Sequence, residues 1–221
     1  FISDKVLNLL KDNGGRLITV FYNFNKVGKV GIIKKIKGKL SKKYYLDSNT
    51  PILNDFKKIK KYCKKKKIPW FVSCWDVGSQ IQMRKFKTKY NKVASAMLVH
   101  EKLLKTIAEE KKHTFISTGM NPMKEVSNAV KIFRKNKCSF ELMHSYGSFP
   151  MSLNEVNIRQ IPIIQKKFKC NVGYNGYEKV AYLACVMAVM FGATSIERHV
   201  TIDRTSYGHD QPASLEPLGL E

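Results

Sequence analysis

Long hydrophobic runs are absent from this chain of 221 residues. No stretch approaches the ~18 apolar residues that a membrane-spanning helix needs, so we expect no membrane span. Cysteine is sparse, with five residues at wide spacing and no Cys-x-x-Cys pair. That pattern argues against a zinc site built from cysteines and favours reduced thiols in a cytoplasmic protein. Residue 1 is Phe rather than Met, so we expect a fragment or trimmed chain, in which no signal peptide can be identified.

Arginine is scarce in spite of a strong basic excess. The formal net charge is +23, yet only six of the 40 basic residues are Arg. A basic chain suggests nucleic acid as a partner, but Arg is the preferred residue for bidentate contacts with phosphates and bases. The lysines instead alternate with apolar residues at helical spacing, most densely from Lys57 to Lys67. We therefore interpret them as solvated helix faces and rank nucleic-acid binding below that interpretation.

Hydrophobic residues make up 43% of the chain, which suits one domain with a real core. From residue 50 onward, strand patterns alternate with helix patterns, and this alternation predicts a parallel sheet. Units repeating at roughly 25 residues favour an α/β fold of the (β/α)8 TIM-barrel type. The predicted strands are 70–76, 92–95, 114–119, 140–144, 171–174 and 195–199, and the predicted helices are 52–67, 80–86, 101–111, 122–136, 153–168 and 178–191.

Residues 1–50 fit this pattern less well. They predict a helix over 4–12, a strand over 16–22 and a second strand over 27–36 that could form a hairpin with the first. Since the second of these two is expected in a hairpin, the strand over 16–22 and the six later strands give about seven of the eight that a barrel needs. We therefore expect the first barrel strand to be missing from the N-terminus. The predicted division is a divergent part over 1–50 and a barrel segment over 51–221.

The last 25 residues carry most of the chemical information. A short apolar run, 194–196, delivers Glu197, Arg198 and His199 to the carboxyl end of the last predicted strand, and a loop rich in Asp, Arg, His and Gly follows. In α/β barrels the carboxyl ends of the strands open on the active site. Glu197 and His199 are two residues apart, so on a strand they point to one face. A barrel interior accepts such groups when they are paired or coordinated.

Six segments in this order resemble the N-acetylneuraminate (sialic acid) synthase family, which includes legionaminate- and pseudaminate-type synthases. The similarity covers roughly residues 50–221, and its most specific parts are Glu-Arg-His at 197–199 and Ala-Ser-Leu-Glu-Pro at 213–217. The matching segments are Trp70 to Asp76, Asn91 to Met97, Ile116 to Met120, Leu142 to His144, Val172 to Tyr174 and Ile196 to Leu218.

The resemblance implies a transferase that condenses phosphoenolpyruvate with an N-acylated hexosamine, such as N-acetylmannosamine, in sialic acid biosynthesis. It implies a divalent metal, Mn²⁺ or Mg²⁺, that polarises the sugar aldehyde, and a homodimer in full-length members. By position, Lys92, Ser95 and Ser117 would bind phosphoenolpyruvate. His199 would be a metal ligand, with Glu197 and Asp210 as catalytic residues on the sugar side.

Three of these assignments have a purely structural alternative. Lys92 could be one more surface lysine, Ser117 could cap the following helix, and Asp210 could stabilise its loop. His144 ends a strand, where a packed histidine is as reasonable as a chemical role.

The chain also departs from the family pattern at positions that bind the metal and the substrates. Tyr177 occupies the position of a second metal-binding His, and a neutral phenol, with an ordinary pKa near ~10, is a poor ligand for these metals. Gly147 and Phe149 stand where polar residues are usual, and Val20 stands where the family has a second lysine for phosphoenolpyruvate. The lid-like C-terminal domain, which closes over the partner subunit's site, is expected to be absent. We therefore expect weak or lost activity.

Two other classes of function remain open. One is a catalytically degenerate barrel that acts as a binding or assembly subunit, and the other is a basic nucleic-acid-binding protein. A different aldolase on the same barrel is also compatible with the pattern, since a fold does not fix its chemistry.

Overall fold

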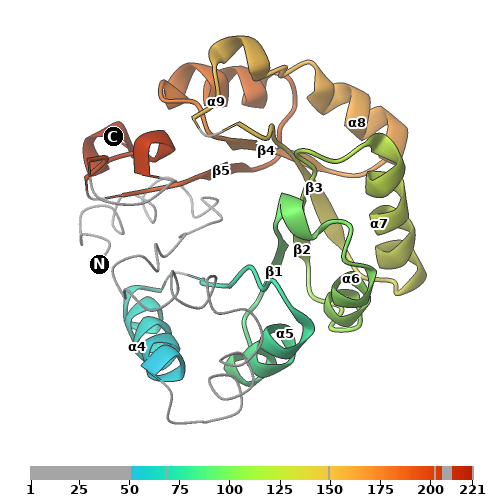
Figure 1. Cartoon of the computed structure of the whole chain (residues 1–221), viewed down its shortest axis with the longest axis vertical. Helices are drawn as coiled ribbons and strands as arrows, with labels where there is room; N and C mark the ends of the chain where they lie inside the picture. The colour runs from blue at the N-terminus through green and yellow to red at the C-terminus, as the bar shows by residue number, and fades with distance from the viewer. Residues whose placement is uncertain (1–50, 68, 149, 202, 206–210, 221) are drawn as a thin grey trace.

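The computed structural model describes residues 51–220, except 68, 149, 202 and 206–210. The predictions for residues 1–50, including Val20 and the domain boundary, therefore lie outside the described residues. Figure 1 labels the elements along the chain. The helices are α4 (Pro51–Lys66), α5 (Val77–Met83), α6 (Glu101–Ala108), α7 (Met123–Lys135), α8 (Gln160–Phe168) and α9 (Ala181–Met190), and the strands are β1 (Asn91–Val93), β2 (Thr114–Ser117), β3 (Phe140–His144), β4 (Val172–Gly176) and β5 (Ile196–Arg198).

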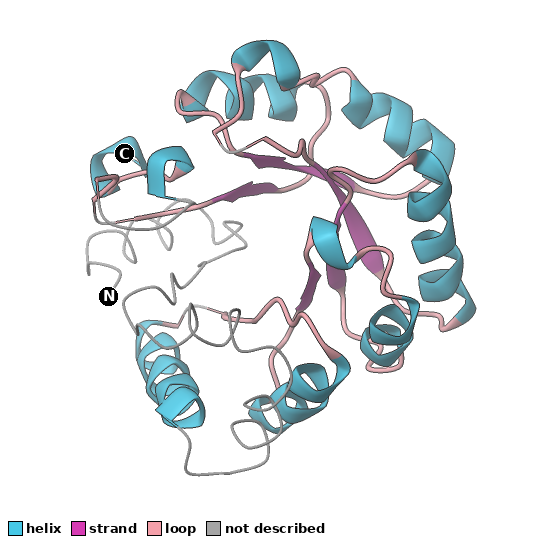
Figure 2. Ribbon diagram, in the orientation of Figure 1, coloured by secondary structure: helices cyan, strands magenta, loops and turns pink. Residues whose placement is uncertain are grey.

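The five strands form one parallel sheet whose spatial order follows the sequence, β1-β2-β3-β4-β5. Each strand returns through a helix, and the helices α6 to α9 surround the convex side of the curled sheet (Figures 1 and 2). A doubly wound sheet would reverse its order and carry helices on both faces, whereas a barrel does neither. The described residues thus form part of a barrel of the (β/α)8 type, the α/β fold class that the sequence predicts.

One predicted strand is wrong. Residues 70–76 do not form a strand. Within the described part of the chain, they join the sheet through a single parallel bridge between Ser73 and Lys92. This segment instead packs through its aromatic side chain Trp70, which stacks on Phe56 of α4 with 6.2 Å between ring centroids. Phe86 meets Trp70 edge-on at 5.7 Å. Side-chain packing therefore holds the segment beside β1 without a hydrogen-bonded ladder.

Several other boundaries differ from the sequence prediction, among them the helix predicted over 80–86, which is α5 at Val77–Met83. Ser95 lies in a short 3₁₀ helix, η3 (Ser95–Met97), directly after β1. The predicted helix over 153–168 is divided into a single turn, η4 (Leu153–Glu155), and α8. A capping box between Ser152 and Glu155 stabilises that turn. It provides acceptors for backbone N–H groups that would otherwise lack a hydrogen-bond partner. Among the described residues, every helix is too short or too polar to cross a membrane.

The core lies between the sheet and its helices. Outward-facing strand residues pack there with Ile107 of α6 and Phe133 of α7, and both of these are 0% exposed. Full burial of one such side chain contributes about 1.5–3 kcal/mol. Because side chains alternate along a strand, the neighbours of these residues must face the concave side. The outward strand residues are Val93, Ile116, Leu142 and Val172.

The concave face is polar as a result. Lys92, Ser117, Asn175 and Glu197 occupy the alternate positions of β1, β2, β4 and β5, and Asn175 and Glu197 are register partners. Each of the four is at most 3% exposed. The strand period thus places these four polar side chains on the concave face, which also includes Phe115 and Met143, whereas the convex face is mainly apolar but includes His144 and Arg198.

Candidate active site

Lys92 is the centre of a buried polar cluster on the concave face. Its ammonium nitrogen Nζ lies 3.4 Å from the carboxylate oxygen Oε2 of Glu197. It donates hydrogen bonds to Ser117 Oγ at 2.5 Å and to the carbonyl oxygen of Val93 at 3.1 Å. Lys92 is 1% exposed and Glu197 is 0% exposed. An ammonium group can lie this deep because a carboxylate and two acceptors replace its water.

Asn175 extends the cluster toward His199. Its amide Nδ2 donates to Ser117 Oγ at 3.1 Å and to the phenol oxygen of Tyr177 at 2.7 Å. The Tyr177 ring meets the His199 ring edge-on, with 5.3 Å between centroids. The contacts form one continuous path across the concave face. We call its six members the inner cluster: Glu197, Lys92, Ser117, Asn175, Tyr177 and His199.

A second polar group, the loop cluster, lies just beyond the carboxyl ends of β1, β2 and β3. The hydroxyl oxygens of Ser95 and Ser145 are 3.3 Å apart, and the Gly119 N–H donates to Ser145 Oγ at 2.9 Å. Asn121 Nδ2 donates to the Ser95 carbonyl oxygen at 2.8 Å. A Cβ atom at residue 119 would lie 2.7 Å from Ser145 Oγ, so glycine is needed for this close approach.

Burial and pairing act in opposite directions on Lys92. Removal from water lowers the pKa of its ammonium group, and the adjacent Glu197 carboxylate opposes that shift. The pair carries no net charge while both groups are ionised. An anion that enters the inner cluster therefore competes with Glu197 for Lys92, which is the cationic member among the six.

The described residues do not fit a divalent metal centre. No group of three or more His, Cys, Asp or Glu side chains converges within them. Of the inner cluster, Glu197 and His199 carry suitable donor atoms, but Glu197 pairs with Lys92 and His199 packs against Tyr177. Mn²⁺ and Mg²⁺ prefer several oxygen or imidazole donors around one point. No catalytic step through a metal follows from this arrangement.

The structure brings most of the predicted site residues together. Lys92, Ser117, Glu197, His199 and Tyr177 all belong to the inner cluster, while Ser95 lies in the loop cluster. The surface-lysine alternative for Lys92 is wrong, because its side chain is buried. Asp210 lies outside the described residues. The roles of these residues in binding and catalysis remain predictions.

The sequence pattern did not predict that Asn175 would link Ser117 to Tyr177. Asn175 appears in the sequence only as a neighbour of Tyr177 in the triplet Asn175-Gly176-Tyr177. The available signal was the strand alternation, since Asn175 is two residues beyond Gly173 on the concave face. Whether its amide would reach Ser117 depends on how far β4 is shifted against β2, which no local pattern fixes.

His144 is a packed histidine, which is the structural alternative considered for it. It is 7% exposed, its Nε2 lies 2.9 Å from the carbonyl oxygen of Val156, and its ring lies against Tyr174 with 6.2 Å between centroids. Burial lowers the pKa of this imidazole. His144 therefore packs and anchors the chain after β3, on the side away from the inner cluster.

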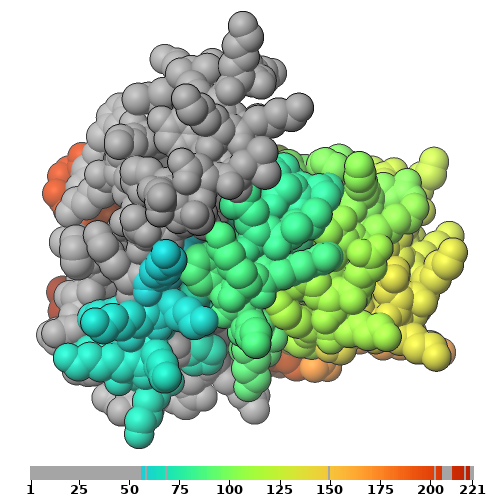
Figure 3. Space-filling view, turned by 90° about the horizontal axis from the view of Figure 1, so that it is seen from below, coloured from blue at the N-terminus to red at the C-terminus, as the bar shows by residue number. Residues whose placement is uncertain are grey.

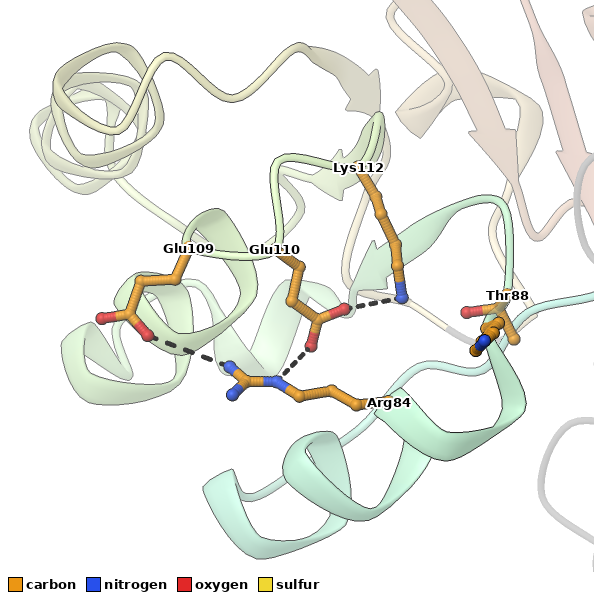
Figure 4. A pocket seen from close by; sticks show the side chains of 6 residues that line it. Arg84, Thr88, Glu109, Glu110 and Lys112 are labelled. Atoms are coloured by element: carbon orange, nitrogen blue, oxygen red, sulfur yellow. Dashed lines mark hydrogen bonds and ion pairs between the residues drawn. The ribbon is translucent and has the colours of Figure 1, made fainter.

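Two surface hollows among the described residues lie outside the inner cluster and the loop cluster. The larger, about 460 Å³, is lined by Arg84, Thr88 and Lys112 near the amino ends of β1 and β2. Figure 4 shows the Glu110 carboxylate held there between Arg84 and Lys112. The smaller, about 260 Å³, lies between the residues after β3 and the start of α9.

A family model and several relatives place the chain among known proteins. The model of the NeuB family matches residues 33–221. The N,N'-diacetyllegionaminic acid synthase of Campylobacter jejuni is 31% identical over 72% of this chain, and the human N-acetylneuraminate-9-phosphate synthase is 30% identical over 74%. A crystal structure of the N-acetylneuraminic acid (sialic acid) synthetase of Leptospira borgpetersenii, in complex with citrate, superposes with a TM-score of 0.72 at 31% identity, covering 76% of this chain and 58% of that one.

The alignments cover a larger share of this chain than of its relatives. The alignments cover 48% of the C. jejuni protein and 46% of the human protein. The chain thus spans about half the length of the curated relatives it matches.

Proposed function

The chain belongs to the NeuB family, and from this membership we propose that it condenses phosphoenolpyruvate with an N-acyl hexosamine to form a nonulosonic acid. Relatives of similar identity are named as synthases of legionaminic and pseudaminic acids. The single observation that carries the proposal is the inner cluster, because it holds a buried lysine beside hydroxyl and amide donors on the concave face of a barrel. We place the reaction in the cytoplasm, since the five cysteines are free thiols.

The proposed reaction balances without an oxidant or reductant. The third carbon of phosphoenolpyruvate bonds to the aldehyde carbon of the sugar, water adds to the second carbon, and phosphate leaves. Lys92 would neutralise the anionic end of phosphoenolpyruvate, and the hydroxyls of Ser117 and Ser95 would donate to its oxygens. Glu197 would hold Lys92 in place and face the sugar. Asp210, after the last strand, would contact the sugar.

We propose that the activity of this chain is weak. Lys92 is the one cationic side chain of the inner cluster, and it is already paired with Glu197. A Mn²⁺ or Mg²⁺ ion would have His199 and Glu197 as its donors among the described residues, and we expect it to bind poorly there. When bound, such an ion would polarise the sugar aldehyde.

The test combines binding with turnover. We expect calorimetry to detect phosphoenolpyruvate binding to the full chain, and Lys92→Met to weaken that binding at least tenfold. Lys105→Met is the matched control, because Lys105 is an exposed lysine of α6 that pairs only with Glu101 one turn away. Turnover is measured as phosphate release from phosphoenolpyruvate with N-acetylmannosamine, with and without Mn²⁺.

Each outcome bears on one part of the proposal. Binding of phosphoenolpyruvate that is insensitive to Lys92→Met, or absent, overturns the proposed site. Fast turnover that disappears in His199→Ala overturns weak activity and supports His199 as a metal ligand. Binding without any turnover favours the alternative, a degenerate barrel that serves as a binding subunit, for which the Tyr177 and His199 packing is the supporting observation.

A further inference from the structure

The basic residues of the described barrel are concentrated at one of its ends. Each helix runs back toward the amino ends of the strands, so the last turns of the helices and the segments that lead back to the sheet gather there. From α4 to α8, these parts of the chain contain 16 Lys and Arg residues and two acidic residues. We call their basic side chains the basic face, which comprises those of residues 64–67, 84–90, 109–113, 134–139 and 166–171.

The opposite end of the barrel has no such excess. Of the segments that follow β1 to β4, residues 94–100 and 118–122 contain no Lys, Arg, Asp or Glu. Residues 145–159 and 177–180 together contain two basic and two acidic residues. The positive charge of the described barrel therefore lies mainly at the amino ends of the strands, away from the loop cluster.

The basic face is exposed and has few carboxylates of its own. Fourteen of its 16 side chains are exposed, and Figure 3 shows long side chains on the surface formed by α4 to α7 (cyan to yellow-green). The two acidic residues of these segments are Glu109 and Glu110. Glu110 pairs with Arg84 and Lys112, and the Glu109 carboxylate lies 3.8 Å from the Arg84 guanidinium. With both carboxylates engaged, the face keeps a large positive excess.

Stabilisation of the helix ends does not account for this charge. A basic residue near a helix C-terminus interacts favourably with the helix dipole, as does an acidic residue near the N-terminus. The acidic counterpart is sparse, because α6 and α7 have one acidic residue each in the first turn, whereas α4, α5, α8 and α9 have none.

The backbone at the helix ends supports the same conclusion. Lys87, Lys111, Lys137 and Lys169 have φ angles between 46° and 53°. Glycine adopts this conformation without strain and is the usual residue where a helix ends in it. Lysine at four such positions indicates a role for the charge itself.

The side chains that recognise nucleic acid are engaged or buried on this face. Arg84 is in an ion pair, and Arg134 donates to the carbonyl oxygen of Phe168. The rings of Phe86 and Phe168 are 5% and 6% exposed, and Tyr90 is half-buried, so they offer little surface for stacked bases. The exposed charges are mainly lysines, which act as point charges and lack the bidentate geometry of Arg. The face therefore fits a partner that is recognised by its charge density.

The arrangement of the basic face favours a planar partner. Helices α4 to α8 follow one another around the curled sheet, so their C-terminal ends form an arc (Figure 1). A flat anionic surface meets all parts of such an arc at once, whereas a rod-shaped duplex meets only a part of it. At an anionic bilayer, each Lys or Arg near the surface strengthens binding roughly fivefold.

We propose that the basic face binds the surface of an anionic lipid bilayer, with the amino ends of the strands toward the lipid and the carboxyl ends toward water. The contact is electrostatic, between lysine ammonium groups and the phosphates and carboxylates of the lipid headgroups. This orientation leaves the loop cluster and the carboxyl-end side of the inner cluster accessible to small molecules. The inference does not depend on the proposed catalytic function.

Co-sedimentation of the full chain with lipid vesicles tests the proposal. At about 0.15 M salt, we expect binding to phosphatidylcholine vesicles that contain about one third phosphatidylserine, and none to phosphatidylcholine alone. Raising the salt to about 0.5 M should release the protein. A fourfold variant, Lys87→Gln, Lys111→Gln, Lys137→Gln and Lys169→Gln, should bind at least tenfold more weakly, because it removes four charges from the contact.

The matched control removes four charges from other parts of the surface. It combines Lys102→Gln, Lys124→Gln, Lys131→Gln and Lys179→Gln, which are exposed lysines outside the basic face. The control should bind the anionic vesicles nearly as tightly as the original chain. Circular dichroism and urea midpoints of both variants should match the original chain, since all eight side chains are exposed.

Three results would overturn the proposal. The first is an absence of binding to the anionic vesicles. The second is an equal loss of binding in both variants, which would mean that net charge alone drives the association. The third uses a labelled DNA duplex at the same salt. Binding to the duplex that is tighter than binding to the vesicles, and that is lost in the basic-face variant but not in the control, would assign the face to nucleic acid instead.

Discussion

At the scale of single residues, buried charges decide what the barrel can tolerate. Two buried ion pairs join separate segments of the described chain. Lys92 of β1 pairs with Glu197 of β5 on the concave side, and Arg198 of β5 pairs with Glu178, which follows β4, on the convex side. Arg198 also donates to the Glu178 carbonyl oxygen, and the Tyr174 hydroxyl donates to the Glu178 carboxylate at 2.8 Å. Because both pairs are out of water, the loss of one partner costs more than the pair itself contributes.

We predict that Arg198→Met lowers the free energy of unfolding by about 3–5 kcal/mol, because Glu178 would remain buried without its cation. The double substitution Arg198→Met with Glu178→Gln should recover part of that loss, since it removes the uncompensated charge as well. Urea unfolding followed by circular dichroism measures both. Equal destabilisation by the single and double variants would show that packing, not charge, dominates at this pair.

The Tyr177 position should control metal affinity. We predict that Tyr177→His increases the affinity for Mn²⁺ at least tenfold, because it places an imidazole donor beside His199 in place of a neutral phenol. Titration of free Mn²⁺ by electron paramagnetic resonance measures the affinity without any need for activity. Tyr146→His is the matched control, since Tyr146 is a half-exposed tyrosine after β3. No gain in Tyr177→His, or an equal gain in the control, contradicts the prediction.

At the scale of elements, the width of a side chain determines how closely a helix approaches the sheet. α9 contacts β4 through alanines, whereas α7 contributes the larger Val126, Val130 and Phe133. Small residues permit a close approach, and no room remains for an added side chain. The position of α9 against β4 is therefore expected to be sensitive to the size of its buried residues.

We predict that Ala188→Leu destabilises the protein by about 1–3 kcal/mol, because the larger side chain has no space between α9 and β4. Val189→Leu is the adjacent control, since Val189 is 57% exposed and its change should remain within about 0.5 kcal/mol. Urea midpoints at constant protein concentration compare the two. A neutral Ala188→Leu would mean that α9 can shift outward freely.

At the scale of the whole molecule, we expect stability to depend on pH through two histidines, the buried His144 and the partly buried His113. Burial lowers the pKa of His144, and desolvation also lowers the pKa of His113. The unfolded chain, with a histidine pKa of about 6.5, then takes up protons before the folded chain does. Stability is therefore complete above that pH and declines as the pH falls below it.

We predict that the free energy of unfolding decreases between pH 7 and pH 5, and that His144→Gln makes this decrease shallower. The glutamine amide can still donate to the Val156 carbonyl oxygen, so the variant should fold. Urea unfolding at several pH values measures the slope, and His113 should account for part of what remains. An unchanged slope in His144→Gln would exclude His144 as a source of the pH dependence.

Much of the architecture follows from local patterns in the sequence. Strand β3 was predicted at its observed bounds, and α4 and α7 to within one residue at each end, because their apolar residues recur at the period of the element. Residues 70–76 look equally strand-like, yet they form one bridge only. A strand needs a partner in register along its length, and a single segment contains no information about that partner.

The sequence by itself determined the order of the elements, the polar concave face and the uncharged composition of α9. Each of these depends on residue type and short-range periodicity alone. Only the tertiary structure decided that Lys92 meets Glu197, that Asn175 joins Ser117 to Tyr177, and that the large side chains of α9 face outward. The physical reason is that these contacts depend on strand register and helix rotation, which are set by packing among segments far apart in the chain.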